Sequence, residues 1–156
     1  MSNIEIYIRF ADKKDIDDLY EWRNDPVTRK NSFNSDYMNK KEHRKWLYES
    51  LKNPQRQIFI LVSSTNEKIG QVRFDNKEYT EAEIDIAISP NYRGRGYGTN
   101  AIKKASDIYL NNFKVDNIMA KIKNDNIASI IAFKRAGFKE NKKLKDYIEL
   151  LKHNEN

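Results

Sequence analysis

One continuous segment of the chain combines a strand pattern, a bare turn and a helix pattern in direct succession. Residues 81–89, EAEIDIAIS, alternate apolar and polar side chains, which is typical of a β-strand with two distinct faces. Residues 90–98, PNYRGRGYG, hold three of the chain's five glycines, and residues 99–113, TNAIKKASDIYLNNF, are amphipathic at helical spacing. The segment therefore predicts a strand that turns through glycine-rich backbone directly into a helix, as in α/β folds.

The rest of the chain supplies further strands and helices around this segment. Apolar alternation and helical spacing predict strands at residues 4–10, 57–64, 68–75, 117–123 and 147–152, and helices at residues 12–22, 40–53 and 126–138. Asn39 and Glu42 form a capping-box-like start for the second helix, and Gly137 is placed to end the last one. The order predicts a single α/β (α+β) domain with a mixed sheet over residues 1–156, with a loose tail at about 152–156.

The composition limits the chemistry that such a domain can use. The 156 residues include 29 lysines and arginines against 23 acidic residues, a net charge of +6, and no cysteine. The absence of cysteine excludes thiol catalysis, cysteine-ligated zinc and disulfides, and we expect no metal. No apolar run approaches the ~20 residues of a membrane span, and the first residues lack the apolar core of a signal peptide, so we expect a cytoplasmic protein without membrane contact. The dispersed lysines argue against a nucleic-acid partner.

The glycine-rich turn has the composition of a phosphate-binding loop. Glycines permit positive φ and close approach of a ligand, while successive backbone amides and the following helix N-terminus attract an anion. Arg93 and Arg95 would add charge-assisted contacts to phosphate oxygens. The segment is not a Walker A loop, because Thr99-Asn100 replace its Lys-Ser/Thr, nor a dinucleotide fingerprint, because its glycines are spaced two and two. The alternative is a tight strand-to-helix turn without a ligand.

Two ordered motifs resemble those of the GNAT superfamily of N-acetyltransferases. Residues 93–98, RGRGYG, match the R/Q-x-x-G-x-G/A segment of that family, and residues 126–138, NIASIIAFKRAGF, are similar to its N-x-x-A/S…Y…GF helix. The resemblance covers residues 81–138 well, and the N-terminal half mainly through the order of its elements. It implies acetyl-CoA as the cosubstrate and a sheet in which two parallel strands, residues 82–89 and 117–123, splay apart to admit it.

The resemblance also implies where the cosubstrate binds. The pyrophosphate would lie on the amides of residues 94–98, and the pantetheine arm would run beside Ile86 to Ile88 like an added strand. The thioester carbonyl would accept a hydrogen bond from a backbone N–H near Ile88. The residues assigned to acetyl-CoA on this basis are Ile86, Ala87, Ile88, Arg93, Gly94, Arg95, Gly96, Tyr97, Gly98, Thr99, Asn126, Ser129 and Phe133.

Acetyl transfer requires a base for the amine and a proton source for the departing thiolate. Glu83 and Asp85 share the strand face opposite the isoleucines, and either could take the amine proton directly or through water, with Glu83 preferred. The alternative is that both are ordinary carboxylates on a solvated face. The family's usual tyrosine corresponds to Phe133, which has no proton to give. Tyr97, Tyr109 or a water would then donate the proton, or the thiolate would leave with little help.

Acceptor specificity in the family resides in the first two helices and the loop between them. The W-R-N arrangement that begins at Trp22 is most similar to acetyltransferases of nucleotide-linked amino sugars, which implies a UDP-4-amino sugar as the acceptor. The residues assigned to the acceptor are Trp22, Arg23, Asn24, Arg29 and His43. The arginines would bind the diphosphate. Each assignment has a plainer alternative: Trp22 as a core anchor, Arg23 paired with Asp25, and His43 as a structural side chain.

Other functions remain open from the sequence. The same arrangement occurs in ribosomal-protein and other amine acetyltransferases, so a peptide N-terminus or another small amine is the nearest alternative acceptor. Phe133 also keeps a non-catalytic CoA-binding domain open. Homodimers are common in the family, and no patch in the sequence decides for or against one. Residues 24–38 are long for a connection within a compact domain, which favours a functional loop.

Overall fold

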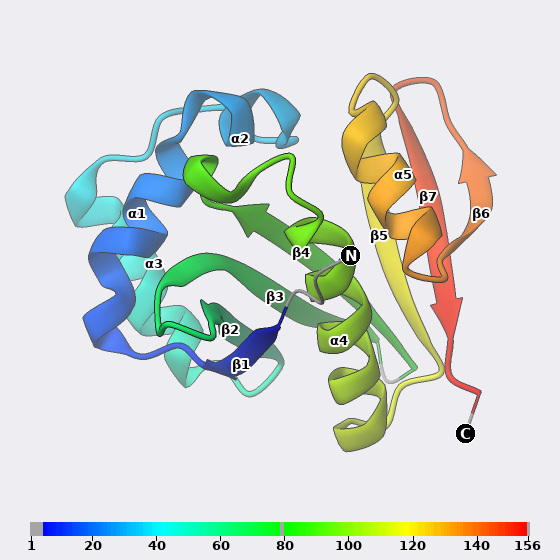
Figure 1. The fold of residues 1–156 in the computed structure, drawn as a ribbon, viewed down its shortest axis with the longest axis horizontal. Helices are drawn as coiled ribbons and strands as arrows, with labels where there is room; N and C mark the ends of the chain where they lie inside the picture. The colour runs from blue at the N-terminus through cyan, green and yellow to red at the C-terminus, as the bar shows by residue number, and fades with distance from the viewer. Residues whose placement is uncertain (1–4, 79, 156) are drawn as a thin grey trace.

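The computed structural model describes residues 5–78 and 80–155, which form a seven-stranded mixed sheet with helices on both faces (Figure 1). The strand order is β1-β2-β3-β4-β5-β7-β6. The strands are β1 (Ile6–Phe10), β2 (Arg56–Ser63), β3 (Lys68–Glu78), β4 (Glu81–Ile88), β5 (Asn117–Lys123), β6 (Lys139–Lys143) and β7 (Tyr147–His153). The helices are α1 (Ile16–Asn24), α2 (Pro26–Asn31), α3 (Lys40–Lys52), α4 (Tyr97–Asn112) and α5 (Ile127–Arg135), with short 3-10 turns η1 (Lys13–Asp15) and η2 (Pro90–Tyr92). The predicted α/β class with a mixed sheet is confirmed.

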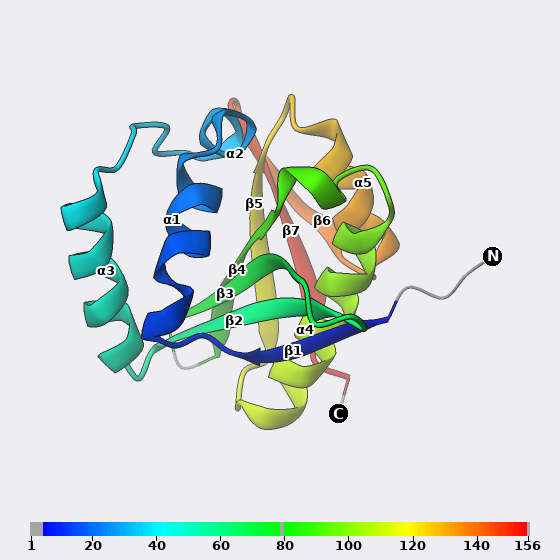
Figure 2. The same ribbon diagram turned by 60° about the vertical axis from the view of Figure 1, so that its left-hand side comes forward.

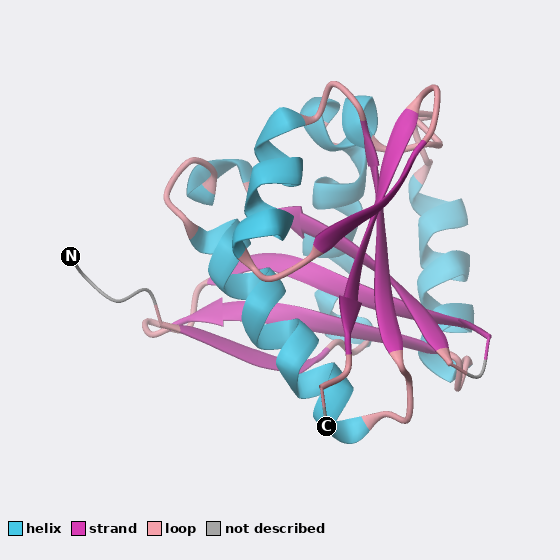
Figure 3. Cartoon of the chain, turned by 90° about the vertical axis from the view of Figure 1, so that its right-hand side faces the viewer, coloured by secondary structure: helices cyan, strands magenta, loops and turns pink. Residues whose placement is uncertain are grey.

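The helices pack against the sheet through two apolar cores, one on each face. The smaller core joins α1 and α3 to β2 through Leu19, Trp22, Leu47, Ile58 and Ile60. The larger core lies beneath α4 and α5 and takes in Val72, Phe74, Ile84, Ile102 and Phe133. The helices of the two cores lie on opposite sides of the sheet (Figure 2), and Figure 3 shows the strong twist of the strands between them. No helix among the described residues is long and apolar enough to cross a membrane.

The helix ends follow from their capping residues. The Asn39 side chain accepts a hydrogen bond from the Glu42 amide at 2.8 Å and starts α3, as its position predicts. The Asn126 side chain accepts from the Ser129 amide at 3.3 Å and starts α5. Gly137 follows α5 with a φ of +101°, in the left-handed region that glycine adopts at low cost.

The parallel strands β4 and β5 separate along their length. Their pairing is confined to Glu81–Glu83 of β4 against Asn117–Met119 of β5. Beyond Glu83, β4 continues to Ile88 and β5 continues to Lys123, and the two strands diverge (Figure 1). The side of β4 that faces β5 therefore has no strand partner near its carboxyl end. This is the opening that the resemblance implies between residues 82–89 and 117–123.

Several local expectations need correction. The predicted helix at residues 12–22 begins as η1, because Asp12 and Asp15 cap each other's backbone, and α1 follows. The connection at residues 24–38 contains α2, which Asp25 caps. Strand β6 was not predicted, because its sequence KENKK is wholly exposed and has no apolar alternation. Within the segment predicted as a tail, β7 reaches His153, and the Asn154 amide donates to the Asp116 carbonyl at 2.7 Å.

Candidate active site

The turn between β4 and α4 presents bare backbone. Gly94 and Gly96 have φ values of +73° and +84°, in the region that favours glycine. Gly96 is also the N-cap of α4 and offers no side-chain hydrogen bond, so the first amides of this helix are available to an anion. A Cβ added at Gly94 or Gly98 would meet no atom within 4 Å. The turn thus presents backbone amides with open space beside Gly94 and Gly98.

The two arginines of the turn make different contacts. The Arg93 Nε donates to the Ile88 carbonyl at 3.1 Å, and its Nη2 donates to Asp25 Oδ2 at 2.6 Å. The Arg95 guanidinium is exposed and lies 5.7 Å from the Tyr92 ring centre. Arg93 therefore points back to α1 and β4, while Arg95 lies at the surface of the turn.

Asp25 is kept ionised by its partners. Burial raises the pKa of Asp25, but the hydrogen bonds from Arg93 and from the Thr28 amide outweigh burial, so its pKa lies below the ordinary value. The same oxygen that binds Arg93 accepts from the Thr28 amide at 3.0 Å and caps α2. The pair that the sequence suggested for Asp25 was with Arg23, and the structure places Arg93 there instead.

The carboxyl-terminal half of β4 is positioned to bind an extended ligand. On one side it pairs with β3, with Val72 opposite Ile86 and Gly70 opposite Ile88. On the other side its pairing with β5 ends at Glu83. Gly70 permits a close approach of the two strands, since a Cβ there would lie 2.4 Å from the Ala87 carbonyl oxygen. The backbone of Ile86 to Ile88 is thus held by β3 on one side and has no strand partner toward β5, although the Ile88 carbonyl already accepts from Arg93.

The candidate bases lie on the opposite face of β4 from α4. Asp85 is exposed and accepts a hydrogen bond from Gln71 Nε2 at 3.0 Å. Glu83 is 25% exposed, and its Oε2 lies 3.8 Å from Lys77 Nζ. Both carboxylates are next to the end of the β4–β5 pairing, and Glu83 makes the weaker contacts of the two.

The side chains considered for proton donation to the thiolate differ in their burial. Phe133 is 3% exposed and packs edge-on against Phe138, with ring centres 5.0 Å apart. Tyr109 is wholly buried and stacked on Phe74, its hydroxyl has no partner among the described residues, and burial raises its pKa to about 12. Tyr97 is half-buried at the first position of α4. Burial removes Tyr109 as a donor, whereas Tyr97 and water stay available.

A pocket of about 410 Å³ lies beside the carboxyl end of β4. It is lined by Tyr20, Glu21, Trp22, Asn24, Asp25, Tyr37, Ser89, Pro90 and Asn91. The hydroxyl oxygens of Tyr20 and Tyr37 lie 2.7 Å apart. Two carboxylates and three aromatic rings thus surround the pocket, and of these only Trp22 was assigned from the sequence. Tyr20, Glu21 and Tyr37 carry no motif that would have identified them.

Of the other residues assigned to the acceptor, Asn24 also lines this pocket, whereas Arg23, Arg29 and His43 do not. The Asn24 side chain is hydrogen bonded in both directions to the Met38 backbone, at 2.8 and 2.9 Å, and fixes the loop after α2. Arg23 Nη2 lies 3.4 Å from the Asn34 carbonyl, and Arg29 Nε donates to the Ser35 carbonyl at 3.0 Å. The two arginines therefore contact loop carbonyls and do not line the pocket.

His43 belongs to the interior of the α1–α3 layer. It is 1% exposed, and its ring lies between Tyr20 and Trp46, at centre distances of 5.5 and 5.7 Å. Burial, and secondarily the Arg23 charge, lower its pKa. The neutral ring is a packing element here, and its Nδ1 has no partner among the described residues.

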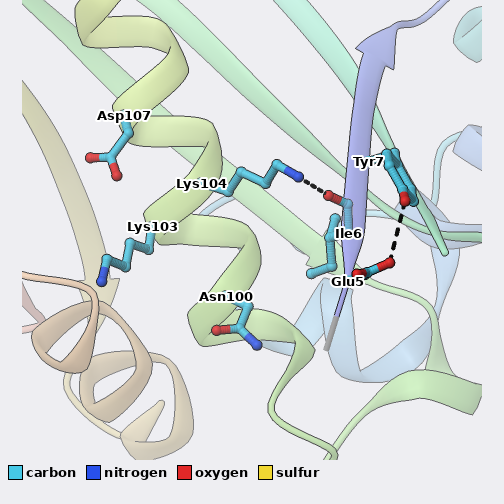
Figure 4. A pocket seen from close by; sticks show the side chains of 7 residues that line it. All are labelled: Glu5, Ile6, Tyr7, Asn100, Lys103, Lys104 and Asp107. Carbon is cyan, nitrogen blue, oxygen red and sulfur yellow. Dashed lines mark hydrogen bonds between the residues drawn. The ribbon is translucent and has the colours of Figure 1, made fainter. Parts of the chain in front are cut away.

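A second pocket lies between β1 and α4, and none of the residues assigned from the sequence lines it (Figure 4). It is lined by Glu5, Ile6, Tyr7, Asn100, Lys103, Lys104 and Asp107. The Lys104 ammonium donates to the Ile6 carbonyl and lies 5.3 Å from the Tyr7 ring centre. These contacts tie α4 to the edge strand.

A sheet that opens between two parallel strands and continues into a glycine turn at a helix N-terminus defines a GNAT-type fold. A family model described as acetyltransferase (GNAT) domain matches residues 5–139, and the chain belongs to this family. The family predicted from the two motifs is therefore confirmed.

Two curated proteins are similar in sequence. The uncharacterized N-acetyltransferase p20 of Bacillus licheniformis is 29% identical over 100 residues, which cover 63% of this chain and 56% of that protein. The uncharacterized N-acetyltransferase MJ1207 of Methanocaldococcus jannaschii is 29% identical over 152 residues, which cover 93% of this chain and 66% of that protein. The chain thus spans between half and two thirds of the length of these relatives.

Solved structures share the fold. Spermidine N-acetyltransferase from Vibrio cholerae, in complex with CoA and spermine, has a TM-score of 0.89 at 17% identity, covering 96% of this chain and 95% of that chain. A domain from Methanocaldococcus jannaschii DSM 2661 has a TM-score of 0.83 at 24% identity, covering 97% and 99%. At these identities the likeness establishes the fold alone, and neither structure is named for a nucleotide amino sugar.

Proposed function

We propose that the protein is an acetyl-CoA-dependent N-acetyltransferase that acts on a small primary amine. The observation that carries the proposal is the edge of β4, which lacks a strand partner beyond Glu83 and leads directly into the glycine turn. An extended pantetheine arm can pair with such an edge as an added strand does, and a diphosphate can bind the amides of residues 94–98. Membership of the family and the CoA-bound V. cholerae structure support this assignment.

The residues around the opening divide the binding of the cosubstrate between them. The backbone of Ile86 to Ile88 would hold the extended arm, and the glycine turn with Arg95 would hold the diphosphate. Asn126 and Ser129 lie at the start of α5, across the opening from α4, with the Asn126 side chain engaged in capping. Phe133 lies in the core beneath both helices, so it would support the site by packing.

The transfer requires a nitrogen lone pair, a base and a departing thiolate. The amine nitrogen forms a C–N bond to the thioester carbonyl carbon, and the C–S bond breaks as the thiolate leaves. Glu83 or Asp85 would accept the nitrogen proton, directly or through water. The thiolate would take its proton from water or Tyr97, because Phe133 has none to give and Tyr109 is wholly buried.

The acceptor pocket favours a cationic amine. Glu21 is exposed at the pocket, and the Tyr20 ring offers a face that attracts cations, whereas the charge of Asp25 is paired with Arg93 and the Tyr37 ring already lies 5.6 Å from the Arg29 guanidinium. A nucleotide amino sugar would need cations for its diphosphate, and the two arginines assigned to that task contact loop carbonyls instead. We therefore place a polyamine-like acceptor ahead of the UDP-amino sugar.

The proposal is tested by release of free thiol from acetyl-CoA in the presence of single amines. The panel contains spermidine, a UDP-4-amino sugar and a peptide with a free N-terminus, with a reaction lacking amine as the control. We expect turnover with spermidine, and a Glu21→Gln variant should raise its KM at least several-fold with little change in the KM for acetyl-CoA. Preference for the UDP-amino sugar would overturn the acceptor class. Binding of CoA without thiol release from any amine would identify a non-catalytic CoA-binding domain.

A further inference from the structure

The Arg93 guanidinium joins the pocket at Tyr20, Glu21 and Asp25, here called the acceptor pocket, to the carboxyl end of β4. Arg93 Nη2 donates to Asp25 Oδ2 at 2.6 Å and to Thr28 Oγ1 at 3.0 Å, while Nε donates to the Ile88 carbonyl at 3.1 Å. Asp25 lines the acceptor pocket, and Ile88 ends the strand that leads into the glycine turn. Arg93 is itself the residue before the first turn glycine, so movement of the turn is transmitted to its side chain.

The bridge is shielded and geometrically specific. The side chains of Arg93 and Asp25 are 30% and 14% exposed, respectively. Charge-assisted hydrogen bonds are stronger than neutral ones, and partial burial reduces the screening that weakens surface pairs. Asp25 also caps α2 through the Thr28 amide. Asp25 thus holds the start of α2 and forms part of the pocket wall, while Arg93 fixes the position of its carboxylate.

Residues 25–33 also contact the strands on the far side of the opening, β5 and β7. Lys123, at the end of β5, donates from Nζ to the Lys30 carbonyl at 2.9 Å. Phe33, just after α2, packs edge-on against Tyr147 of β7, with ring centres 5.4 Å apart. Figure 2 shows α2 beside the upper ends of these strands. Residues 25–33 thus contact Arg93 on the β4 side of the opening and strands β5 and β7 on the other side.

We propose that Arg93 is a positioning residue that couples occupancy of the glycine turn to the order of the acceptor pocket. This inference rests on the proposed cosubstrate site. A diphosphate bound to the amides of residues 94–98 fixes the turn, and Arg93 then holds Asp25 and α2 in place. An acceptor that binds the ordered wall no longer has to order it, so the two ligands bind with positive cooperativity.

The test is hydrogen exchange of the amides in residues 25–33, measured with and without CoA in the wild-type protein and three variants. Arg93→Gln and Asp25→Asn cut the bridge. Arg9→Gln is the matched control, because Arg9 makes a similar two-pronged contact with Asp15, at 2.8 and 2.9 Å, on β1 and far from the turn in the chain. CoA should slow exchange by about fivefold or more in the wild type and in Arg9→Gln, in line with ordinary coupling strengths, and should not slow it in the two bridge variants.

The outcomes separate this inference from the proposed function. Equal protection of residues 25–33 in Arg93→Gln and wild type overturns the coupling and leaves the acetyltransferase proposal standing. All exchange measurements are made at CoA concentrations that saturate each variant. A loss of CoA affinity by ~100-fold or more in Arg93→Gln, with exchange of residues 25–33 in the saturated variant slowed as much as in the wild type, makes Arg93 a diphosphate ligand and also overturns the coupling. Coupling without turnover of any amine retains this inference and removes the enzyme proposal. If Arg93→Gln does not fold, Thr28→Ala and Asp25→Asn carry the same test.

Discussion

Replacement of Gly94 by alanine measures how far the turn between β4 and α4 depends on a residue without a Cβ. Gly94 has a φ of +73°, and an added Cβ would meet no atom within 4 Å, so the substitution creates no clash. Its cost is the energy of a left-handed conformation for a residue with a Cβ, about 1–2 kcal/mol. For a protein of this size, 1 kcal/mol corresponds to about 2–4 °C, so we expect Tm to fall by about 2–8 °C.

Gly98→Ala is the matched control for this experiment. Gly98 also has open space around its Cβ position, but it lies in the first turn of α4 and is not among the glycines with positive φ. Alanine is a better helix former than glycine by up to about 1 kcal/mol, so this variant should be neutral or more stable. Thermal unfolding of the CoA-free proteins measures both effects. A decrease in Tm of the same size in both variants, or none in Gly94→Ala, would refute the requirement for glycine at the positive φ of residue 94.

Three further predictions concern protonation and catalysis. Burial lowers the pKa of His43, so the imidazole binds a proton more tightly in the unfolded chain than in the folded one. The free energy of unfolding should therefore fall as the pH drops through about 6.5. His43→Phe should remove that part of the pH dependence. Phe133→Tyr should leave kcat nearly unchanged, because the ring is 3% exposed in the core and an added hydroxyl there would be buried away from the reaction. Glu83→Gln should lower kcat by about 10²-fold and more than Asp85→Asn does, because Asp85 is already engaged by Gln71.

The measurements and contradicting results differ for each of these. Urea unfolding at pH 7.5 and pH 5 tests His43, and an unchanged difference between wild type and variant would show that this ring is not responsible. Thiol-release kinetics test the other two. A higher kcat in Phe133→Tyr would show that this side chain reaches the departing thiolate. A larger loss in Asp85→Asn would transfer the role of base from Glu83.

Local patterns in the sequence were sufficient for the centre of the fold. The alternation over β4 and the following glycines depend on neighbouring residues only, and the structure places the strand, the turn and α4 where these patterns indicate. The caps at Asn39 and Asn126 were predictable for the same reason, since a capping side chain binds an amide three residues away. The two motifs also predicted the opening between β4 and β5, which Figure 1 shows directly.

The contacts around the acceptor pocket could not be predicted from local patterns. Arg93 and Asp25 are 68 residues apart, and nothing in the spacing of either residue indicates that they pair. Tyr20 and Tyr37 meet through the return of the loop after α2, which the sequence presents as an unstructured connection. Strand β6 depends on pairing with β7 and on no apolar face of its own. The first two features arise from contacts between segments distant in the sequence, and β6 is a strand only because its hairpin partner β7 pairs with it.

The most direct test of the central claim is a crystal structure of the protein with bound CoA. We expect the diphosphate within hydrogen-bonding distance of the amides of residues 94–98, and the pantetheine arm paired with the backbone of Ile86 to Ile88. A Gly96→Trp variant, which fills the same space, should show no binding of CoA in titration calorimetry. A diphosphate bound elsewhere on the protein, or normal affinity in Gly96→Trp, would contradict the account.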